Sequence, residues 1–257
     1  MAKNDFSAES AENFEQKCLC VLVLDVSGSM REIVDDSNMQ YTGETMYMDG
    51  KKYNLVTGGI SKLDLLNEGL QNFYNEVSTD DTTSQRLELC IITFNDYVQV
   101  VQEPALPENV TIPELKGEGD TALADAVNEA IDKVEARKNW YKATGQPYYR
   151  PWIILMTDGV PNKGQDINSL AQRIKNDTDA KKYAFLPVGV EGADMDVLQR
   201  IAGNGMNATK LKGMRFAQFF RWLSASMGTV TKAEEGQTVN FSEGATGDAG
   251  WMDAFTI

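Results

Sequence analysis

The chain has 257 residues, of which 42% are apolar and 24% are charged, a composition typical of a globular protein. Its 38 acidic residues outnumber its 24 basic ones, and the resulting net charge of −14 argues against nucleic acid or an anionic membrane surface as a partner. The sequence contains no histidine, which excludes serine–histidine and cysteine–histidine nucleophile pairs and histidine metal ligands. The length suits one large α/β domain or at most two small ones.

Three cysteines, Cys18, Cys20 and Cys90, lie inside apolar runs. We interpret them as reduced core thiols, with a three-thiolate metal site as the alternative, although no fourth ligand is evident. The N-terminal segment has no basic start followed by an apolar stretch, and the longest apolar runs are too short to span a bilayer. We therefore expect no signal peptide, no membrane association and a cytoplasmic location.

Short apolar runs alternate with amphipathic segments along the first half of the chain. Residues 18–24 are apolar throughout, which predicts a strand in the middle of a parallel sheet. Apolar residues recur at helical spacing in 61–77 and predict a helix. Residues 87–94 predict a second core strand, and a turn at Asn95-Asp96 leads into 97–102, which we predict as an antiparallel edge strand.

The second half of the chain repeats this alternation. Its patterns predict strands at 152–157, 183–188 and 209–211, and helices at 121–134, 167–176, 194–201 and 216–227. The predicted fold class is therefore α/β, a Rossmann-like, doubly wound and mostly parallel sheet with one antiparallel edge strand and helices on both faces. We expect a single domain over 1–257, with its core at about 17–230, because no repeat or proline-rich linker interrupts the pattern.

Two segments stand outside the alternation. Residues 31–60 are polar and contain three tyrosines and glycine turn signals, which predicts a hairpin-like insertion directly after the first strand. Residues 232–257 form an acidic C-terminal tail that nevertheless contains several large apolar side chains. Docking of this tail on the body and disorder remain equal alternatives.

Oxygen-bearing side chains follow the first predicted strand at alternate positions. Asp25, Ser27 and Ser29 can converge where Gly28 lets the backbone turn. Carboxylate and hydroxyl oxygens are hard ligands, which suit Mg²⁺, Ca²⁺ or Mn²⁺ better than Zn²⁺. Ordinary turn and capping chemistry is the alternative for these three residues, because serine and aspartate are common in turns.

Two residues further along the chain strengthen the prediction of a metal site. Thr121 begins a predicted helix, and Asp158 follows the core strand at 152–157. In a doubly wound sheet this strand neighbours the first one across the switch point, where ligands bind. We therefore expect all five side chains to meet at the carboxyl edge of the sheet.

The set of Asp25, Ser27, Ser29, Thr121 and Asp158 resembles the metal-ion-dependent adhesion site of von Willebrand factor type A domains. Residues 148–159, 185–189 and 216–224 are similar to the bacterial TerY-like branch, which is associated with tellurium resistance, and the resemblance covers about 17–230. It implies that these five residues are the ligands of one divalent cation, with Mg²⁺ preferred and Ca²⁺ or Mn²⁺ as alternatives. In that family one aspartate binds the metal directly and the other through water, and one coordination position stays open for a carboxylate of a partner protein.

The resemblance also implies a function. We expect a non-enzymatic, metal-dependent protein-binding module, which serves as an adaptor or scaffold in a bacterial stress or tellurium-resistance system. A kinase or phosphatase of the same system is the candidate partner. The chain departs from the family at Asp120, where glycine is common. This extra carboxylate could tighten metal binding, weaken the approach of an acidic partner, or simply face solvent at the start of the helix.

Two alternatives remain open. A metal-assisted phosphohydrolase also begins with an aspartate at the end of a strand, but such sites usually have a second acid two residues later, where this chain has Ser27. No lysine or arginine follows at an evident spacing for holding a phosphate. The other alternative is a structural domain of the same family whose metal site is vestigial.

Overall fold

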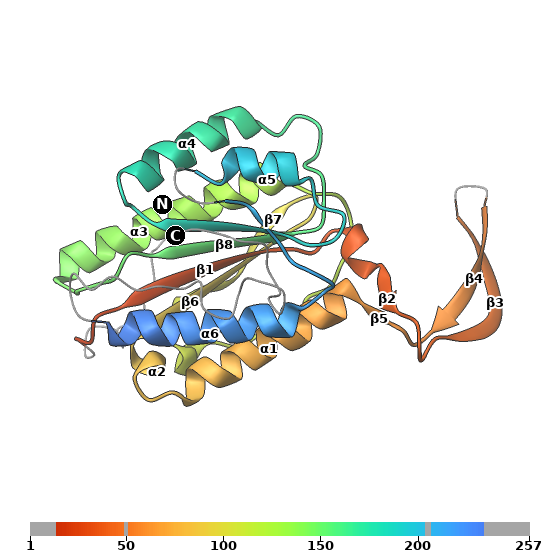
Figure 1. Cartoon of the computed structure of the whole chain (residues 1–257), viewed down its shortest axis with the longest axis horizontal. Coiled ribbons are helices and arrows are strands. Elements are labelled where there is room, and N and C mark those ends of the chain that lie inside the picture. The colour runs from red at the N-terminus through yellow and green to blue at the C-terminus, as the bar shows by residue number, and fades with distance from the viewer. Residues whose placement is uncertain (1–13, 49–50, 204–206, 234–257) are drawn as a thin grey trace.

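The computed structural model describes residues 14–48, 51–203 and 207–233 and has a six-stranded central sheet (Figure 1). The strand order is β10-β9-β8-β1-β6-β7. The strands are β1 (Cys18–Asp25), β6 (Leu87–Phe94), β7 (Val98–Ala105), β8 (Trp152–Thr157), β9 (Ala184–Gly189) and β10 (Thr209–Lys210). All neighbours pair in parallel except β6 and β7, so the predicted mostly parallel sheet with one antiparallel edge strand is confirmed.

Strand β1 lies in the middle of the sheet because both of its faces are apolar. It pairs with β6 on one side and β8 on the other, and every residue in it is buried. Its side chains alternate between two hydrophobic clusters, with Leu22 and Leu24 in one and Val21 and Val23 in the other. The continuous apolar run therefore places the end of β1 at the centre of the carboxyl edge.

Helices cover both faces of the sheet (Figure 1). One face carries α1 (Lys62–Thr79), α2 (Thr83–Arg86) and α6 (Phe216–Lys232), and the other carries α3 (Leu123–Thr144), α4 (Ile167–Asp179) and α5 (Met195–Ile201). Each predicted helix is present, and α2 and the short 3-10 helix η3 (Pro107–Asn109) are additional. Short elements of this kind lack a periodic apolar pattern and so give little signal in the sequence.

Helix α3 extends ten residues beyond the predicted end at Val134. Its last turns are held by a buried polar cluster, because Arg137 Nε donates to Glu88 Oε2 at 2.7 Å and the Tyr141 hydroxyl donates to the same carboxylate. Arg137 and Tyr141 are each at most 1% exposed. A charged residue that continues the buried side of a helix is invisible to a search for apolar spacing.

The cysteines are free and buried, as predicted. Cys18 and Cys20 belong to the cluster beneath α1 and α6, whereas Cys90 belongs to the cluster on the opposite face. Burial raises the pKa of Cys18 to about 12. The sheet lies between Cys90 and the other two thiols, so the three do not face one another in the three-thiolate site considered above.

Two strand pairs lie in the segment at 31–60 (Figure 1). Directly after the 3-10 helix η2 (Gly28–Arg31), β2 (Ile33–Asp35) pairs with β5 (Ile60–Ser61), and beyond them β3 (Gln40–Met48) pairs with β4 (Lys51–Thr57). We call these two strand pairs the arm. Figure 1 shows the outer pair, β3 and β4, standing away from the body of the molecule, and Tyr41 and Tyr47 in it are 71% and 73% exposed.

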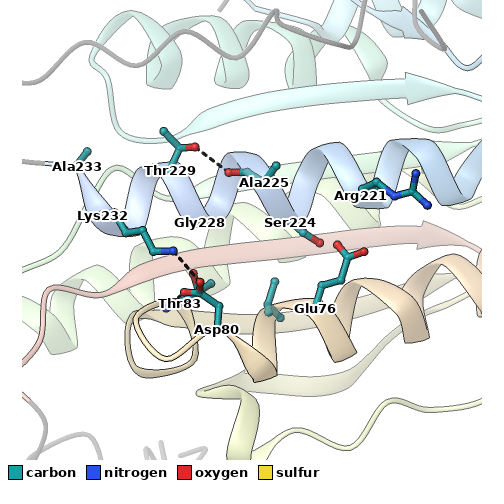
Figure 2. A pocket seen from close by; sticks show the side chains of 11 residues that line it. Glu76, Asp80, Thr83, Arg221, Ser224, Ala225, Gly228, Thr229, Lys232 and Ala233 are labelled. Carbon is teal, nitrogen blue, oxygen red and sulfur yellow. Dashed lines mark hydrogen bonds and ion pairs between the residues drawn. The ribbon is translucent and has the colours of Figure 1, made fainter.

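The opposite end of the molecule has a hollow of about 570 Å³ between α1, α2 and α6 (Figure 2). Lys232 Nζ lies 2.6 Å from Asp80 Oδ2 across it. Of the tail at 232–257, only Lys232 and Ala233 belong to the described residues, so the question of docking or disorder falls outside them. No helix in the described ranges is both long and apolar enough to cross a membrane.

Candidate functional site

Asp25 and Asp158 lie at the same edge of the sheet because β1 and β8 are adjacent and parallel. Asp25 ends β1 beside Thr157, and the Thr157 hydroxyl donates a hydrogen bond to Asp25 Oδ2. The backbone N–H of Ser27 donates to Asp25 Oδ1 at 2.8 Å, where the chain turns after the strand. The Asp25 carboxylate is therefore held on both of its oxygens.

The serine hydroxyls join Asp25 to Asp158. Ser27 Oγ lies 3.1 Å from Ser29 Oγ, and Ser29 Oγ donates to Asp158 Oδ1 at 2.6 Å. Helix η2 produces this arrangement because it turns the chain sharply after Ser27 and carries Ser29 back over the edge of the sheet. The three residues predicted to converge after β1 do so, and they reach the carboxylate that follows β8.

Thr121 reaches the site from a loop that crosses over the turn after β1. Gly28 N–H donates to the Gly119 carbonyl at 2.9 Å, and Thr121 N–H donates to Asn162 Oδ1 at 2.9 Å. A Cβ atom built on Gly159 would lie 2.8 Å from Thr121 Oγ1 and 3.3 Å from Asp25 Oδ2. The Thr121 hydroxyl and the Asp25 carboxylate thus share a space that exists because residue 159 is glycine.

Four of the five candidate ligands are buried, and the fifth marks the open side of the site. Asp25, Ser27, Thr121 and Asp158 are at most 5% exposed, whereas Ser29 is exposed. Burial raises the pKa of Asp25 to about 6, even though hydrogen bonds from Ser27 and Thr157 lower it, and the negative charge of Asp158 adds to the increase. A cation bound here would offset the cost of keeping the buried Asp25 carboxylate ionised.

The structure also brings in Lys62, which the sequence analysis missed. Lys62 is 3% exposed, and its Nζ lies 2.8 Å from Asp158 Oδ2, 2.7 Å from Glu32 Oε2 and 3.0 Å from the Glu191 carbonyl. Although burial lowers its pKa, the bonds to Asp158 and Glu32 outweigh that effect and raise it. A signal did exist, because lysine is unfavourable at the first residue of a helix, where Lys62 stands in α1.

The residues present fit a hard divalent cation. Two carboxylates and three hydroxyls gather at one edge, and all are oxygen donors of the kind that Mg²⁺, Ca²⁺ and Mn²⁺ prefer. Within the described residues no three His, Cys, Asp or Glu side chains form a cluster that could hold a metal ion, so the candidate donor set depends on the serine and threonine hydroxyls beside Asp25 and Asp158. Asp120 is exposed, and its backbone N–H donates to Asp96 at 3.1 Å, which agrees with the solvent-facing alternative for this residue.

The sequence profile of the von Willebrand factor type A domain matches residues 70–220, which is more than half of the chain. The chain therefore belongs to the von Willebrand factor type A domain family. The matched range includes Thr121 and Asp158 and begins after Asp25, Ser27 and Ser29. The structure is thus what places the first three candidate ligands beside the other two.

Similar solved structures include two from bacterial pili. The PilB minor pilin from Streptococcus sanguinis is 13% identical, with a TM-score of 0.53 over 82% of this chain and 61% of the pilin. The vWF domain of the type V pili tip protein Mfa5 from Porphyromonas gingivalis is 9% identical, with a TM-score of 0.49 over 87% of this chain and 99% of that domain. The chain therefore spans about three fifths of the length of the pilin. Comparison with curated protein sequences gave no match.

Proposed function

We propose that this von Willebrand factor type A domain is a metal-dependent protein-binding module. Asp25, Ser27, Ser29, Thr121 and Asp158 would hold one divalent cation, and a carboxylate of a partner protein would complete its coordination. The observation that carries the proposal is the Ser27–Ser29–Asp158 chain of contacts, which gathers oxygens from separate segments and leaves Ser29 on the open side.

The chain's own residues fix the donor atoms. Thr157 holds the Asp25 carboxylate, Asn162 holds the backbone of Thr121, and Lys62 holds one oxygen of Asp158. Bound metal would supply positive charge that neutral hydroxyls leave uncompensated, and this charge would attract an acidic side chain in a partly desolvated site. The hydroxyl-rich donor set therefore favours recognition of an acid over a closed structural metal site.

The finer assignments extend the resemblance seen in the sequence. We propose Mg²⁺ as the cation, a single domain over 1–257, a cytoplasmic location, and an adaptor or scaffold role of the TerY-like kind with a kinase or phosphatase as partner. The segments at 148–159 and 216–224 support the TerY-like branch, whereas the similar solved structures include pilus proteins. Identification of the partner would decide between these settings.

A non-enzymatic role is part of the proposal. Lys62 is a cation beside Asp158, which the phosphohydrolase alternative had lacked, but it is 3% exposed and its ammonium group already has three oxygen acceptors. The position of the second acid remains Ser27. A binding module needs no group that transfers a proton, so it accounts for Lys62 and Ser27 as they stand.

Affinity capture from the native cell tests the proposal. The immobilised full chain, loaded with Mg²⁺, should retain a partner that a chelator elutes, and Ser27→Ala or Thr121→Val should reduce this capture. Thr229→Val, at an exposed threonine of α6, is the matched control and should capture as much as the unsubstituted chain. Capture that neither the chelator nor the two site substitutions affect would contradict the proposal.

A further inference from the structure

A hollow of about 540 Å³ lies at the foot of the arm, next to the candidate metal site. Strands β2 and β5 form one side of it, and the start of α1 and the loops after β9 and β10 form the rest. Lys62 lines the hollow and also contacts Asp158, so a single side chain joins the hollow to the metal site. A partner bound at the metal would lie against this hollow.

Apolar side chains line part of the hollow. Ile33, Val34, Ile60 and Met214 contribute them, and Ile33 and Val34 are 39% and 37% exposed. These residues give a surface on which an aliphatic chain of several carbons can be buried.

The charges of the hollow are mostly negative. Glu32, Asp35 and Glu191 line it and are exposed, whereas Lys62, the basic lining residue, is buried against Asp158. Hydrogen bonds from the side chain of Ser37 and from its backbone N–H, which donates to Asp35 Oδ1 at 2.9 Å, keep the pKa of that carboxyl below its ordinary value. The lining therefore offers carboxylates to a cation that approaches along apolar walls.

We propose that this hollow binds the side chain of a lysine or arginine of the partner, next to the acid that the metal would take. The aliphatic stem would lie on Ile33, Val34 and Ile60, and the cationic end would reach the carboxylates of the lining. This step rests on the proposed function, but the affinity of the hollow for a cationic side chain does not depend on the metal. The two claims can therefore be tested separately.

A fragment titration tests the hollow alone. 1-Butylguanidinium is titrated into the full chain with chelator present, and the methyl NMR signals of Ile33, Ile60 and Met214 are followed, with butyrate and 1-pentanol as comparison ligands. We expect saturable shifts with the guanidinium and clearly weaker ones with the other two. The double variant Asp35→Asn/Glu191→Gln should weaken binding roughly two- to fivefold, as the loss of exposed charge pairs does.

The matched control is Glu108→Gln, an exposed acid outside the hollow, which should bind the guanidinium as the unsubstituted chain does. Three outcomes would overturn the proposal. The guanidinium causes no shifts, butyrate or pentanol causes equal shifts, or the double variant binds the guanidinium as tightly as the unsubstituted chain. Ser27→Ala should leave this titration unchanged, so failure of the metal site would not be confused with failure of the hollow.

A peptide series tests the link between the two sites. Acetylated peptides with an arginine and an aspartate, separated by glycine spacers of increasing length, are compared in Mg²⁺ with peptides that carry glycine in place of arginine. One spacer length should bind best, and Asp35→Asn/Glu191→Gln should weaken that peptide roughly two- to fivefold without affecting its arginine-free counterpart. Equal affinity with and without arginine at every length would overturn the joint use of the two sites.

Discussion

The Lys62 ammonium and the Asp158 carboxylate form a buried ion pair, with side chains 3% and 0% exposed, beside the space proposed for the metal. Lys62 plays two opposed parts there. It orients Asp158 and compensates its charge without metal, and it adds positive charge that a divalent cation must overcome. With metal bound as proposed, metal affinity and the stability of the metal-free chain would be coupled through this one side chain.

Lys62→Met should strengthen Mg²⁺ binding and weaken the metal-free fold. Loss of the ammonium removes repulsion of the cation, and we expect a gain of roughly tenfold or more in affinity by isothermal titration calorimetry. The same change leaves Asp158 unpaired, which costs about 3–5 kcal/mol of unfolding free energy in chelator. Mg²⁺ should recover part of this loss in a thermal melt.

The control for this prediction is Lys116→Met. Lys116 is 83% exposed and lies 4.0 Å from the nearest acidic oxygen, so its loss should change neither quantity measurably. Weaker Mg²⁺ binding by the Lys62→Met chain would show that the ammonium supports the metal and does not compete with it.

Gly159→Ala should damage metal binding more than stability. A Cβ atom at this position would approach Thr121 Oγ1 to 2.8 Å, so the threonine hydroxyl must move away from Asp25. We expect roughly tenfold weaker Mg²⁺ affinity by calorimetry, in the range seen when the groups that orient metal ligands are lost. Gly228→Ala is the control, because its Cβ would meet Thr83 Oγ1 at an ordinary 3.6 Å. Unchanged affinity in Gly159→Ala would place the Thr121 hydroxyl outside the donor set.

At the scale of the elements, the arm and the body depend on different interactions. Strand β3 pairs with β4, and its described side chains from Gln40 to Tyr47 are exposed, so the hairpin contributes little to the core. A lone two-stranded hairpin is marginally stable in water. The outer hairpin of the arm therefore adds little to the stability of the fold.

Removal of the outer hairpin should leave the body intact. Excision of residues 38–58, with Ser37 joined to Gly59, retains the pairing of β2 with β5 that frames the hollow. We expect the melting temperature to change by no more than about 2 °C, as for changes outside the core. The Mg²⁺ affinity should change by no more than about twofold. A loss of cooperative unfolding would show that the arm is part of the folding unit.

Helices α1 and α6 are tied at their ends by Asp80 and Lys232 (Figure 2). Lys232 and the backbone N–H of Thr83 lower the pKa of Asp80 below its ordinary value of 3.8. A carboxyl whose pKa is lowered on folding stabilises the fold above its unfolded pKa, and this contribution is lost as the pH falls through the folded value. Its effect is therefore largest at neutral pH.

Asp80→Asn should accordingly destabilise the chain at pH 7 and lose most of that effect as the pH falls well below 3.8. Urea unfolding at the two pH values measures the difference, and Asp81→Asn, at the exposed neighbouring acid, is the control. An equal loss at both pH values would contradict this account, because it would mean that the charge of Asp80 does not stabilise the fold.

Local patterns in the sequence predicted most of the elements but not their polar contacts. The bounds of β6 and β8 follow directly from apolar runs at 87–94 and 152–157. The end of α3 does not, because a buried ion pair between Arg137 and Glu88 replaces apolar contacts there. In general, the spacing of apolar residues within a short segment predicts which side of an element is buried, whereas a buried charge depends on a partner elsewhere in the chain.

The candidate site divides in the same way. Asp25 and Asp158 were predictable because strand ends in a parallel sheet share an edge, and the serines follow from their spacing after β1. The contact of Lys62 with Asp158 was not, because the two residues lie 96 positions apart and meet only through the packing of α1 on the sheet. The unfavourable place of Lys62 at the start of α1 marked the residue but not its partner. Spacing cannot reveal a contact that the fold alone creates.

At the scale of the whole molecule, the chain combines a net charge of −14 with a site proposed to bind an acid. The negative charge of the chain would repel an acidic partner at long range, so local attraction must overcome this repulsion. The proposed cation at the carboxyl edge would attract the acid, and the carboxylates of the hollow would attract a basic residue of the same partner. Lys62 contacts Asp158 and also lines the hollow, so the candidate metal site and the hollow lie next to each other. Binding without metal should therefore be weak.

Titration of Mn²⁺ into the chelator-treated full chain, followed by electron paramagnetic resonance, tests the metal site most directly. We predict one bound Mn²⁺ per chain that Mg²⁺ displaces, with affinity weakened roughly tenfold or more by Ser27→Ala/Thr121→Val. Absence of binding at millimolar Mn²⁺, or binding that the double substitution leaves unchanged, would contradict the assignment of these oxygens as ligands.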